Sequence, residues 1–135
     1  MGEINQYLFV YGTLLVKDNE FAAHLLANSR FYAQGKLGGK LYDIGEYPGL
    51  TLVPNDDHFV YGNIYFMPDP EATLKILDHY EGFGDNEALP NEFVRQLATI
   101  ESLGKLLTCW VYEYNLPVDD YPAILSGDYL DYMKS

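Results

Sequence analysis

The segment from Phe59 to Met67 constrains the fold more than any other stretch, because it alternates as a β-strand does and yet is apolar on both faces. Successive strand residues point to opposite faces, so a strand that is apolar on both faces has protein on either side of it. Such a strand belongs in the wall of a barrel or a sandwich. One face carries Phe59, Tyr61, Asn63 and Tyr65, and the other carries Val60, Gly62, Ile64 and Phe66.

A helix is predicted directly after this strand. The run Asp69-Pro70-Glu71 supplies a capping Asp, a Pro for the first helical position and an acid near the positive end of the helix dipole. Gly82 is expected to end this helix. Three apolar side chains share one of its faces: Leu74, Leu77 and Tyr80.

The rest of the chain predicts more strands and few helices. Two alternating segments, 92–100 and 106–114, form a hairpin around a turn at 101–104. Segment 31–44 is interpreted as one or two strands, in which closely spaced glycines indicate bends or bulges. The other predictions are a strand at 8–15, a helix at about 18–28 with Phe21, Leu25 and Leu26 on one face, a turn at Tyr47-Pro48-Gly49, a polar lid or rim at 83–91 and a short helix within 126–131.

These elements predict a single domain over residues 1–135 with an α+β fold, a curled mixed β-sheet or small β-barrel with a few short helices.

The formal charge of -12 repels phosphate backbones and anionic lipid surfaces, so we expect neither nucleic acid nor membrane as a partner. The single cysteine, Cys109, cannot form an internal disulfide and lies mid-strand as a small buried hydrophobe. A reducing, cytoplasmic location is the simplest interpretation, since no apolar run is long enough to span a membrane.

The stretch Tyr11-Gly12-Thr13-Leu14 follows the apolar run Leu8-Phe9-Val10. A buried strand that enters a glycine turn leaves backbone N–H groups free to hold a carboxylate or a developing oxyanion. Lys17 is the only basic residue near it in sequence, so recognition there would rest on the main chain. An ordinary turn is the alternative.

Two later segments, 41–49 (Leu-Tyr-Asp-Ile-Gly-Glu-Tyr-Pro-Gly) and 77–82 (Leu-Asp-His-Tyr-Glu-Gly), give this stretch more weight. In this order, the three segments resemble the gamma-glutamylcyclotransferase and gamma-glutamylamine cyclotransferase superfamily, and the resemblance runs from Leu8 to about Tyr132. It implies an enzyme, independent of cofactors, that releases 5-oxoproline and a free amine from a small gamma-glutamyl substrate. It places the catalytic acid/base on Glu81 and the substrate-binding loop on Tyr11, Gly12, Thr13 and Leu14.

The residues themselves leave alternatives at this site. Glu81 at a helix C-terminus has a raised pKa if it is held among aromatic groups, or is simply solvated. Asp78, one turn earlier, either shares its face or points to solvent. Glu92 is the second candidate base, and Arg95 either pairs with an acid or is a surface charge. Phe93 stands where relatives often have Tyr, which removes a hydroxyl.

Other chemistries have less support. The three histidines and one cysteine have no metal-ligand spacing, so no metal site is expected. A non-catalytic domain that binds a small ligand or a partner in the same pocket is the alternative function, and an enzyme for a different amide is a third. The leaving amine, which we expect the 83–91 loop to select, and the oligomeric state are left open.

Overall fold

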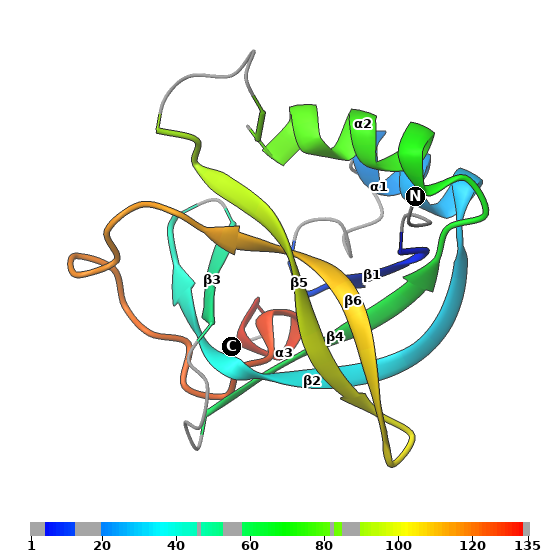
Figure 1. Cartoon of the computed structure of the whole chain (residues 1–135). Coiled ribbons are helices and arrows are strands. Elements are labelled where there is room, and N and C mark those ends of the chain that lie inside the picture. Colours follow the sequence, from blue (N-terminus) through cyan, green and yellow to red (C-terminus); the bar gives the residue numbers. More distant parts are fainter. Residues whose placement is uncertain are drawn as a thin grey trace.

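The computed structural model describes residues 5–12, 20–45, 47–52, 58–81, 83–84 and 90–133. In this part of the chain a six-stranded sheet has the order β3-β2-β4-β1-β6-β5, and β5 pairs again with β2 through Lys36 and Glu101. Five strands therefore close into a barrel, and β3 extends it beside β2 (Figure 1). The elements are β1 Tyr7–Val10, α1 Glu20–Asn28, β2 Arg30–Asp43, β3 Pro48–Leu52, β4 Phe59–Phe66, α2 Pro70–Glu81, β5 Phe93–Ser102, β6 Lys105–Tyr114 and α3 Tyr129–Met133.

The barrel is mixed, as the sequence predicts. β1 is antiparallel to β4 and parallel to β6, whereas the pairs β2–β4, β2–β5 and β5–β6 are all antiparallel. The predicted α+β class and small barrel are thus confirmed.

Two apolar clusters lie on opposite faces of the barrel wall. In β1, Phe9 belongs to one cluster, whereas Leu8 and Val10 belong to the other, because successive strand residues face opposite ways. The second cluster contains Leu25 of α1 and Leu74 and Leu77 of α2, so this face of the sheet is the one that α1 and α2 cover. The predicted two-sided apolar wall is confirmed only in part of β4: Val60 and Ile64 lie in one cluster and Tyr65 in the other, but Phe59 and Tyr61 are 37 % and 43 % exposed.

Helices α1 and α2 lie side by side over that face (Figure 1). The predicted start of α2 is confirmed, because the Asp69 carboxylate accepts the backbone N–H of Ala72 at 3.3 Å and so caps the helix. In α1, Leu25 is fully buried, but Leu26 is 53 % exposed, so the prediction that both share the buried face is wrong for Leu26. The side chains of Phe21 and Tyr80 lie outside the described residues.

Two local predictions are wrong in detail. The turn lies before Pro48 rather than on it: Ile44 donates its N–H to the carbonyl of Tyr47, Gly45 has a φ of 128°, and Pro48 and Gly49 already pair with β2. Segment 31–44 forms one continuous strand, and its register shift falls between Phe31 and Ala33 rather than at a glycine.

The predicted hairpin and C-terminal helix are confirmed. β5 and β6 pair along their whole length around a turn at Leu103 and Gly104. Residues 122–127 bond to both β2 and β4: Ile124 donates its N–H to the carbonyl of Leu41 of β2 at 2.7 Å, and the carbonyl of Gly127 accepts the N–H of Tyr61 of β4 at 2.8 Å. α3 follows this segment, away from α1 and α2 (Figure 1).

Candidate active site

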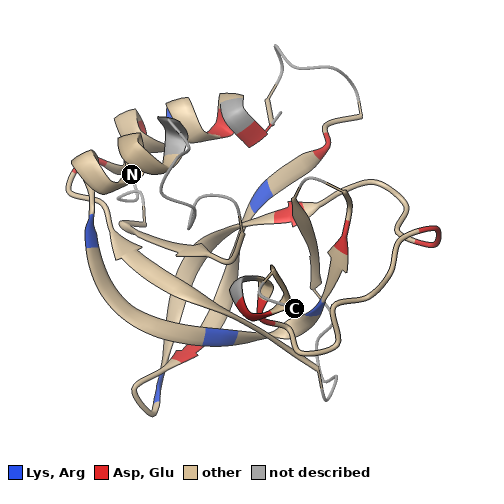
Figure 2. Ribbon diagram, turned by 180° about the vertical axis from the view of Figure 1, so that it is seen from behind, with Lys and Arg blue, Asp and Glu red and all other residues tan. Residues whose placement is uncertain are grey.

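Glu81 is the last residue of α2. The backbone N–H of Phe83 donates to the carbonyl of Asp78 at 2.9 Å, the six-to-one bond that closes a helix C-terminus in the Schellman motif. Gly82, expected to end the helix, lies outside the described residues. Acidic positions occur at the end of α2 and at the start of β5, with a basic position further along β5 (Figure 2).

The environment of Glu81 suits proton transfer near neutral pH. Burial, and then the negative charges of Glu92 and Asp78, raise the pKa of the Glu81 carboxyl to about 8. The charge of Glu81 in turn contributes to raised pKa values at Tyr11, Tyr47 and Tyr112, in each case after the larger effect of burial. The charge of Glu81 therefore acts on phenols that come from three other parts of the barrel.

Tyr11 follows β1 and is 6 % exposed. Its hydroxyl donates to the backbone carbonyl of Tyr112 and accepts the N–H of Leu50 at 3.4 Å. This one phenol joins the end of β1 to β6 and β3. The side chain of Tyr11 is thus held in place by hydrogen bonds directly before Gly12.

Gly12 lies against Pro48. A Cβ atom at Gly12 would lie 2.6 Å from Cγ of Pro48, closer than real Cβ contacts. The first and second sequence segments of the resemblance therefore meet here. Thr13, Leu14 and Lys17 lie outside the described residues, so the backbone anion-binding loop stays a prediction.

Asp78 does not point to solvent, as one alternative proposed. Arg95 of β5 donates Nε–H to one oxygen of Asp78 at 2.7 Å and Nη2–H to the other at 3.0 Å. The Tyr112 hydroxyl donates to the same carboxylate at 2.7 Å. Arg95 also stacks over Trp110, with 4.3 Å from Cζ to the ring centroid. The sequence indicated an acid partner for Arg95, but it gave no signal for the role of Tyr112.

Glu92, the second candidate base, accepts a hydrogen bond from the hydroxyl of Tyr47. Phe93 is buried between Tyr47 and Tyr114, at ring-centroid distances of 5.9 and 5.3 Å. The side chain that replaces a family Tyr thus packs as an aromatic core residue. Tyr47 lies in the Tyr-Pro-Gly stretch, which the sequence pointed to as a turn and as part of the 41–49 resemblance segment, without indicating a contact with Glu92.

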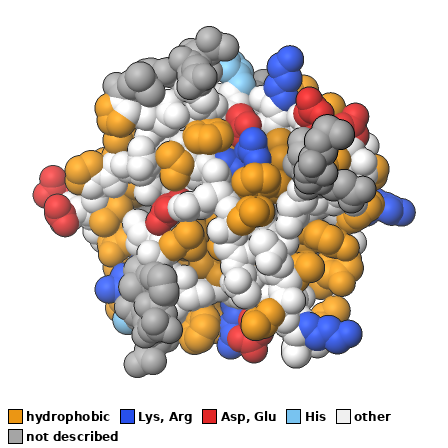
Figure 3. Space-filling view, in the orientation of Figure 1, with side chains coloured by type: hydrophobic (Ala, Val, Ile, Leu, Met, Phe, Trp, Pro, Cys, Tyr) orange, Lys and Arg blue, Asp and Glu red, His pale blue; other side chains and the backbone are white. Residues whose placement is uncertain are grey.

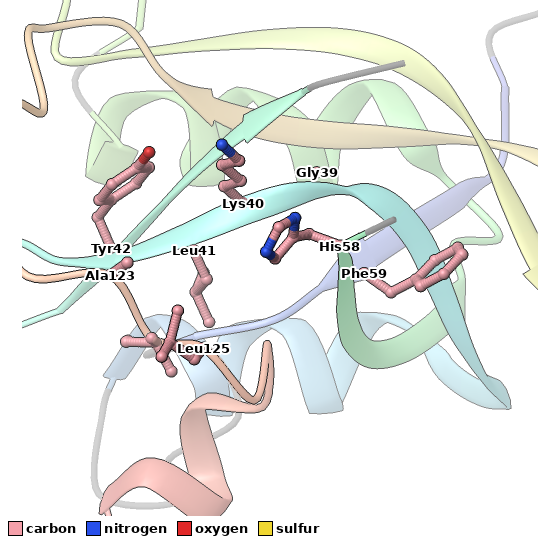
Figure 4. A pocket seen from close by; sticks show the side chains of 9 residues that line it. Gly39, Lys40, Leu41, Tyr42, His58, Phe59, Ala123 and Leu125 are labelled. Carbon is pink, nitrogen blue, oxygen red and sulfur yellow. The ribbon is translucent and has the colours of Figure 1, made fainter. Parts of the chain in front are cut away.

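Two pockets in the described part of the chain lie away from Glu81. A pocket of about 110 Å³ lies between β2 and residues 123–125, with Leu41 pointing toward Leu125 (Figure 4). A pocket of about 190 Å³ is bordered by Tyr11 and Asp128. On the face seen in Figure 3, hydrophobic side chains are spread out rather than gathered into one patch.

Among the described residues, no set of three or more His, Cys, Asp or Glu side chains is placed to hold a metal ion. No helix in the same part of the chain has the length and apolarity to cross a membrane.

Comparisons with known proteins agree with this arrangement. Residues 8–131 match the model of the family described as gamma-glutamyl cyclotransferase, AIG2-like. The gamma-glutamylcyclotransferase family protein YtfP of Escherichia coli K12 is 33 % identical over 125 residues, which cover 92 % of this chain and 96 % of that protein.

Solved structures have the same fold. The solution structure of YtfP from E. coli superimposes with a TM-score of 0.67 and 30 % identity, over 94 % of this chain and 98 % of that one. An AIG2-like protein from Mus musculus has a TM-score of 0.71 at 24 % identity, over 92 % of this chain and 87 % of that one, and supports the fold alone. This chain therefore belongs to the gamma-glutamyl cyclotransferase, AIG2-like family.

Proposed function

We propose that the protein is a gamma-glutamyl cyclotransferase that converts a small gamma-glutamyl amine or peptide into 5-oxoproline and a free amine, with Glu81 as general acid/base. One observation carries the proposal: Glu81, half-buried at the end of α2, has a carboxyl whose pKa is raised to about 8, and its charge reaches Tyr11, Tyr47 and Tyr112. A carboxyl with a pKa near the working pH both accepts and returns a proton readily.

The reaction is an intramolecular aminolysis. The α-amine of the glutamyl group attacks its own γ-carbonyl carbon, a nitrogen–carbon bond forms, and the five-membered lactam closes. The bond from that carbon to the attached amine breaks, and the amine leaves with a proton. These bonds balance without an oxidant, a reductant or added water, so the chemistry requires no cofactor. Holding the substrate folded supplies much of the rate.

Glu81 moves the proton in both halves of this reaction. As a carboxylate it takes a proton from the substrate α-ammonium, which frees the amine lone pair for attack. As a carboxylic acid it then donates that proton to the leaving nitrogen. The raised pKa of Glu81 brings it closer to that of an ammonium group, so the first transfer is less uphill than it would be to an ordinary glutamate.

The substrate carboxylate or the oxyanion would bind at the stretch that begins with Tyr11 and Gly12. The contact of Gly12 with Pro48 supports a close-packed turn at this point. The backbone N–H groups of Gly12, Thr13 and Leu14 are the donors we propose. They would compensate for an overall charge of -12, which disfavours an anionic substrate.

A product assay tests this function. We would incubate the purified protein with a panel of gamma-glutamyl amines and dipeptides, and measure 5-oxoproline, free glutamate and the released amine by mass spectrometry. Equal amounts of 5-oxoproline and amine, without glutamate, are expected. The N-acetylated form of each substrate is the control, because its blocked α-amine cannot cyclise.

Other outcomes identify the alternatives. Release of glutamate instead of 5-oxoproline would mean hydrolysis of the amide by water and would contradict cyclisation. Binding of the panel compounds by calorimetry without turnover of any of them would favour a domain that binds its ligand and does no chemistry.

A further inference from the structure

The last turn of α2 is tied to the barrel by one carboxylate, that of Asp78. Arg95 of β5 contacts both of its oxygens at 2.7 and 3.0 Å, and the hydroxyl of Tyr112 of β6 contacts one of them at 2.7 Å. The Asp78 and Arg95 side chains are each only 18 % exposed. A two-pronged Arg–carboxylate contact fixes orientation as well as distance.

The main chain of Asp78 also takes part in the hydrogen bond that ends α2. Its carbonyl accepts the N–H of Phe83, and the ring of Phe83 lies 5.8 Å from Cζ of Arg95. Glu81 lies between Asp78, which the barrel holds through its carboxylate, and Phe83, whose N–H bonds to the Asp78 carbonyl. Glu81 therefore has little freedom to move as long as both contacts hold. Residues three apart on a helix are neighbours on its surface.

We propose that Asp78 is the positioning residue of Glu81: its carboxylate, bound by Arg95 and Tyr112, fixes the end of α2 against the β5–β6 hairpin and so holds Glu81 in the site. This inference rests on the proposed function for the role of Glu81, but its structural part does not. A helix anchor that is too far from Glu81 to interact with it would leave the titration of Glu81 unchanged. A positioning residue in this arrangement also acts on Glu81 through its charge.

In the part of the chain that the structure describes, the charged and titratable groups associated with Glu81 come from five elements or their ends. Asp78 lies on α2, Glu92 just before β5 with Arg95 on that strand, Tyr112 on β6, Tyr11 at the end of β1, and Tyr47 just before β3. Glu92 and Asp78 contribute to the raised pKa of Glu81, and Asp78 is the one that Arg95 holds in place. Replacing Asp78 by Asn keeps the shape and removes one of these two negative charges.

The experiment is a titration of the Glu81 carboxyl by carbon-13 NMR, in protein labelled at the glutamate carboxyl carbon, with Glu81→Gln used to assign the resonance. In Asp78→Asn we expect the midpoint to fall by about one pH unit. If the proposed enzyme activity is present, kcat in this variant falls by about tenfold or more, with a much smaller change in KM, because the reacting carboxyl is displaced. Glu101→Gln removes the exposed ion pair with Lys36, at 4.0 Å, and serves as the matched control with no effect on either quantity.

A second variant keeps the proposal testable where Asp78→Asn does not fold. Arg95→Lys keeps the positive charge but loses the two-pronged contact. We expect it to lower kcat by about tenfold while leaving the Glu81 midpoint within a few tenths of a pH unit, since the charges are retained.

The two parts of the account fail separately. An unchanged Glu81 midpoint in Asp78→Asn, or an unchanged kcat in Arg95→Lys, would overturn the positioning role even in an active enzyme. A protein that turns over no gamma-glutamyl compound, but in which the Glu81 midpoint falls in Asp78→Asn, would overturn the proposed function and keep the coupling between Asp78 and Glu81.

Discussion

Gly12 and Pro48 lie so close together that a methyl group at position 12 would come within 2.6 Å of the Pro48 ring. The two residues are far apart in sequence, one just after β1 and the other at the start of β3. The requirement for glycine is therefore one of space. Gly12 does not have a positive φ, so backbone conformation is not the reason for glycine here.

Gly12→Ala is expected to destabilise the fold by roughly 1–3 kcal/mol, the usual cost of forcing extra atoms into a packed region. Denaturant unfolding of the wild type and the variant measures this. Pro48→Ala removes the ring atoms that the new methyl group would meet, so the double variant should lose less stability than the sum of the two single variants. Full stability in Gly12→Ala would contradict the packing described here.

Glu81→Gln is expected to stabilise the protein at alkaline pH. The pKa of Glu81 is about 8 in the folded protein against 4.5 for an ordinary glutamate, so between these values the folded state keeps a proton that the unfolded state has lost. The free energy of unfolding of the wild type therefore falls as pH rises through this window, by up to about 1.4 kcal/mol per pH unit from this group. Gln carries no such proton, so the variant escapes this loss.

The measurement is urea unfolding of both proteins at pH 4, 6, 8 and 9. The stability of Glu81→Gln relative to wild type should grow from pH 4 to pH 8 and then level off. A difference that stays constant with pH would mean that Glu81 titrates as an ordinary exposed glutamate does.

The turn between β5 and β6 offers a stabilising substitution. Leu103 has a φ of 54° and Gly104 a φ of 74°, the pattern of a two-residue turn that prefers Asn-Gly. Leu103 is 78 % exposed, so it gains little from burial. We expect Leu103→Asn to raise the free energy of unfolding by roughly 0.5–1 kcal/mol, since Asn tolerates this conformation better than Leu. Leu106→Asn, at an equally exposed leucine outside the turn, should give no such gain; equal effects in the two variants would refute the backbone explanation.

Local patterns predicted most of the fold. The cap at Asp69 depends on residues close in sequence and is found as expected. The strand at 59–66 also forms, but Phe59 and Tyr61 on one of its two apolar faces are exposed. The turn near Pro48 was misplaced because a proline that suits a turn also suits the first residue of a strand. Leu26 was misplaced because the helical pattern of α1 does not reveal how wide a stripe its neighbours cover.

The site was less predictable, because its contacts join distant segments. The pairing of Asp78 with Arg95 and Tyr112 requires the β5–β6 hairpin to lie beside α2, which no local pattern specifies. The same holds for Tyr47 and Glu92, 45 residues apart. Glu81 itself came from the resemblance, and the desolvation that raises its pKa is a property of the assembled barrel.

The most direct test of the central claim compares wild type, Glu81→Gln and Glu71→Gln with a gamma-glutamyl substrate that the wild type turns over. Glu71 lies in the first turn of the same helix, exposed and at the opposite end from Glu81, so it is the matched control. Glu81→Gln should lower the rate of 5-oxoproline release by roughly 100-fold or more, as loss of a general acid/base does, with its fold intact by circular dichroism. Glu71→Gln should retain the wild-type rate. Release of 5-oxoproline by Glu81→Gln at the wild-type rate would contradict the assignment of Glu81, and Glu92→Gln would then be the variant to measure.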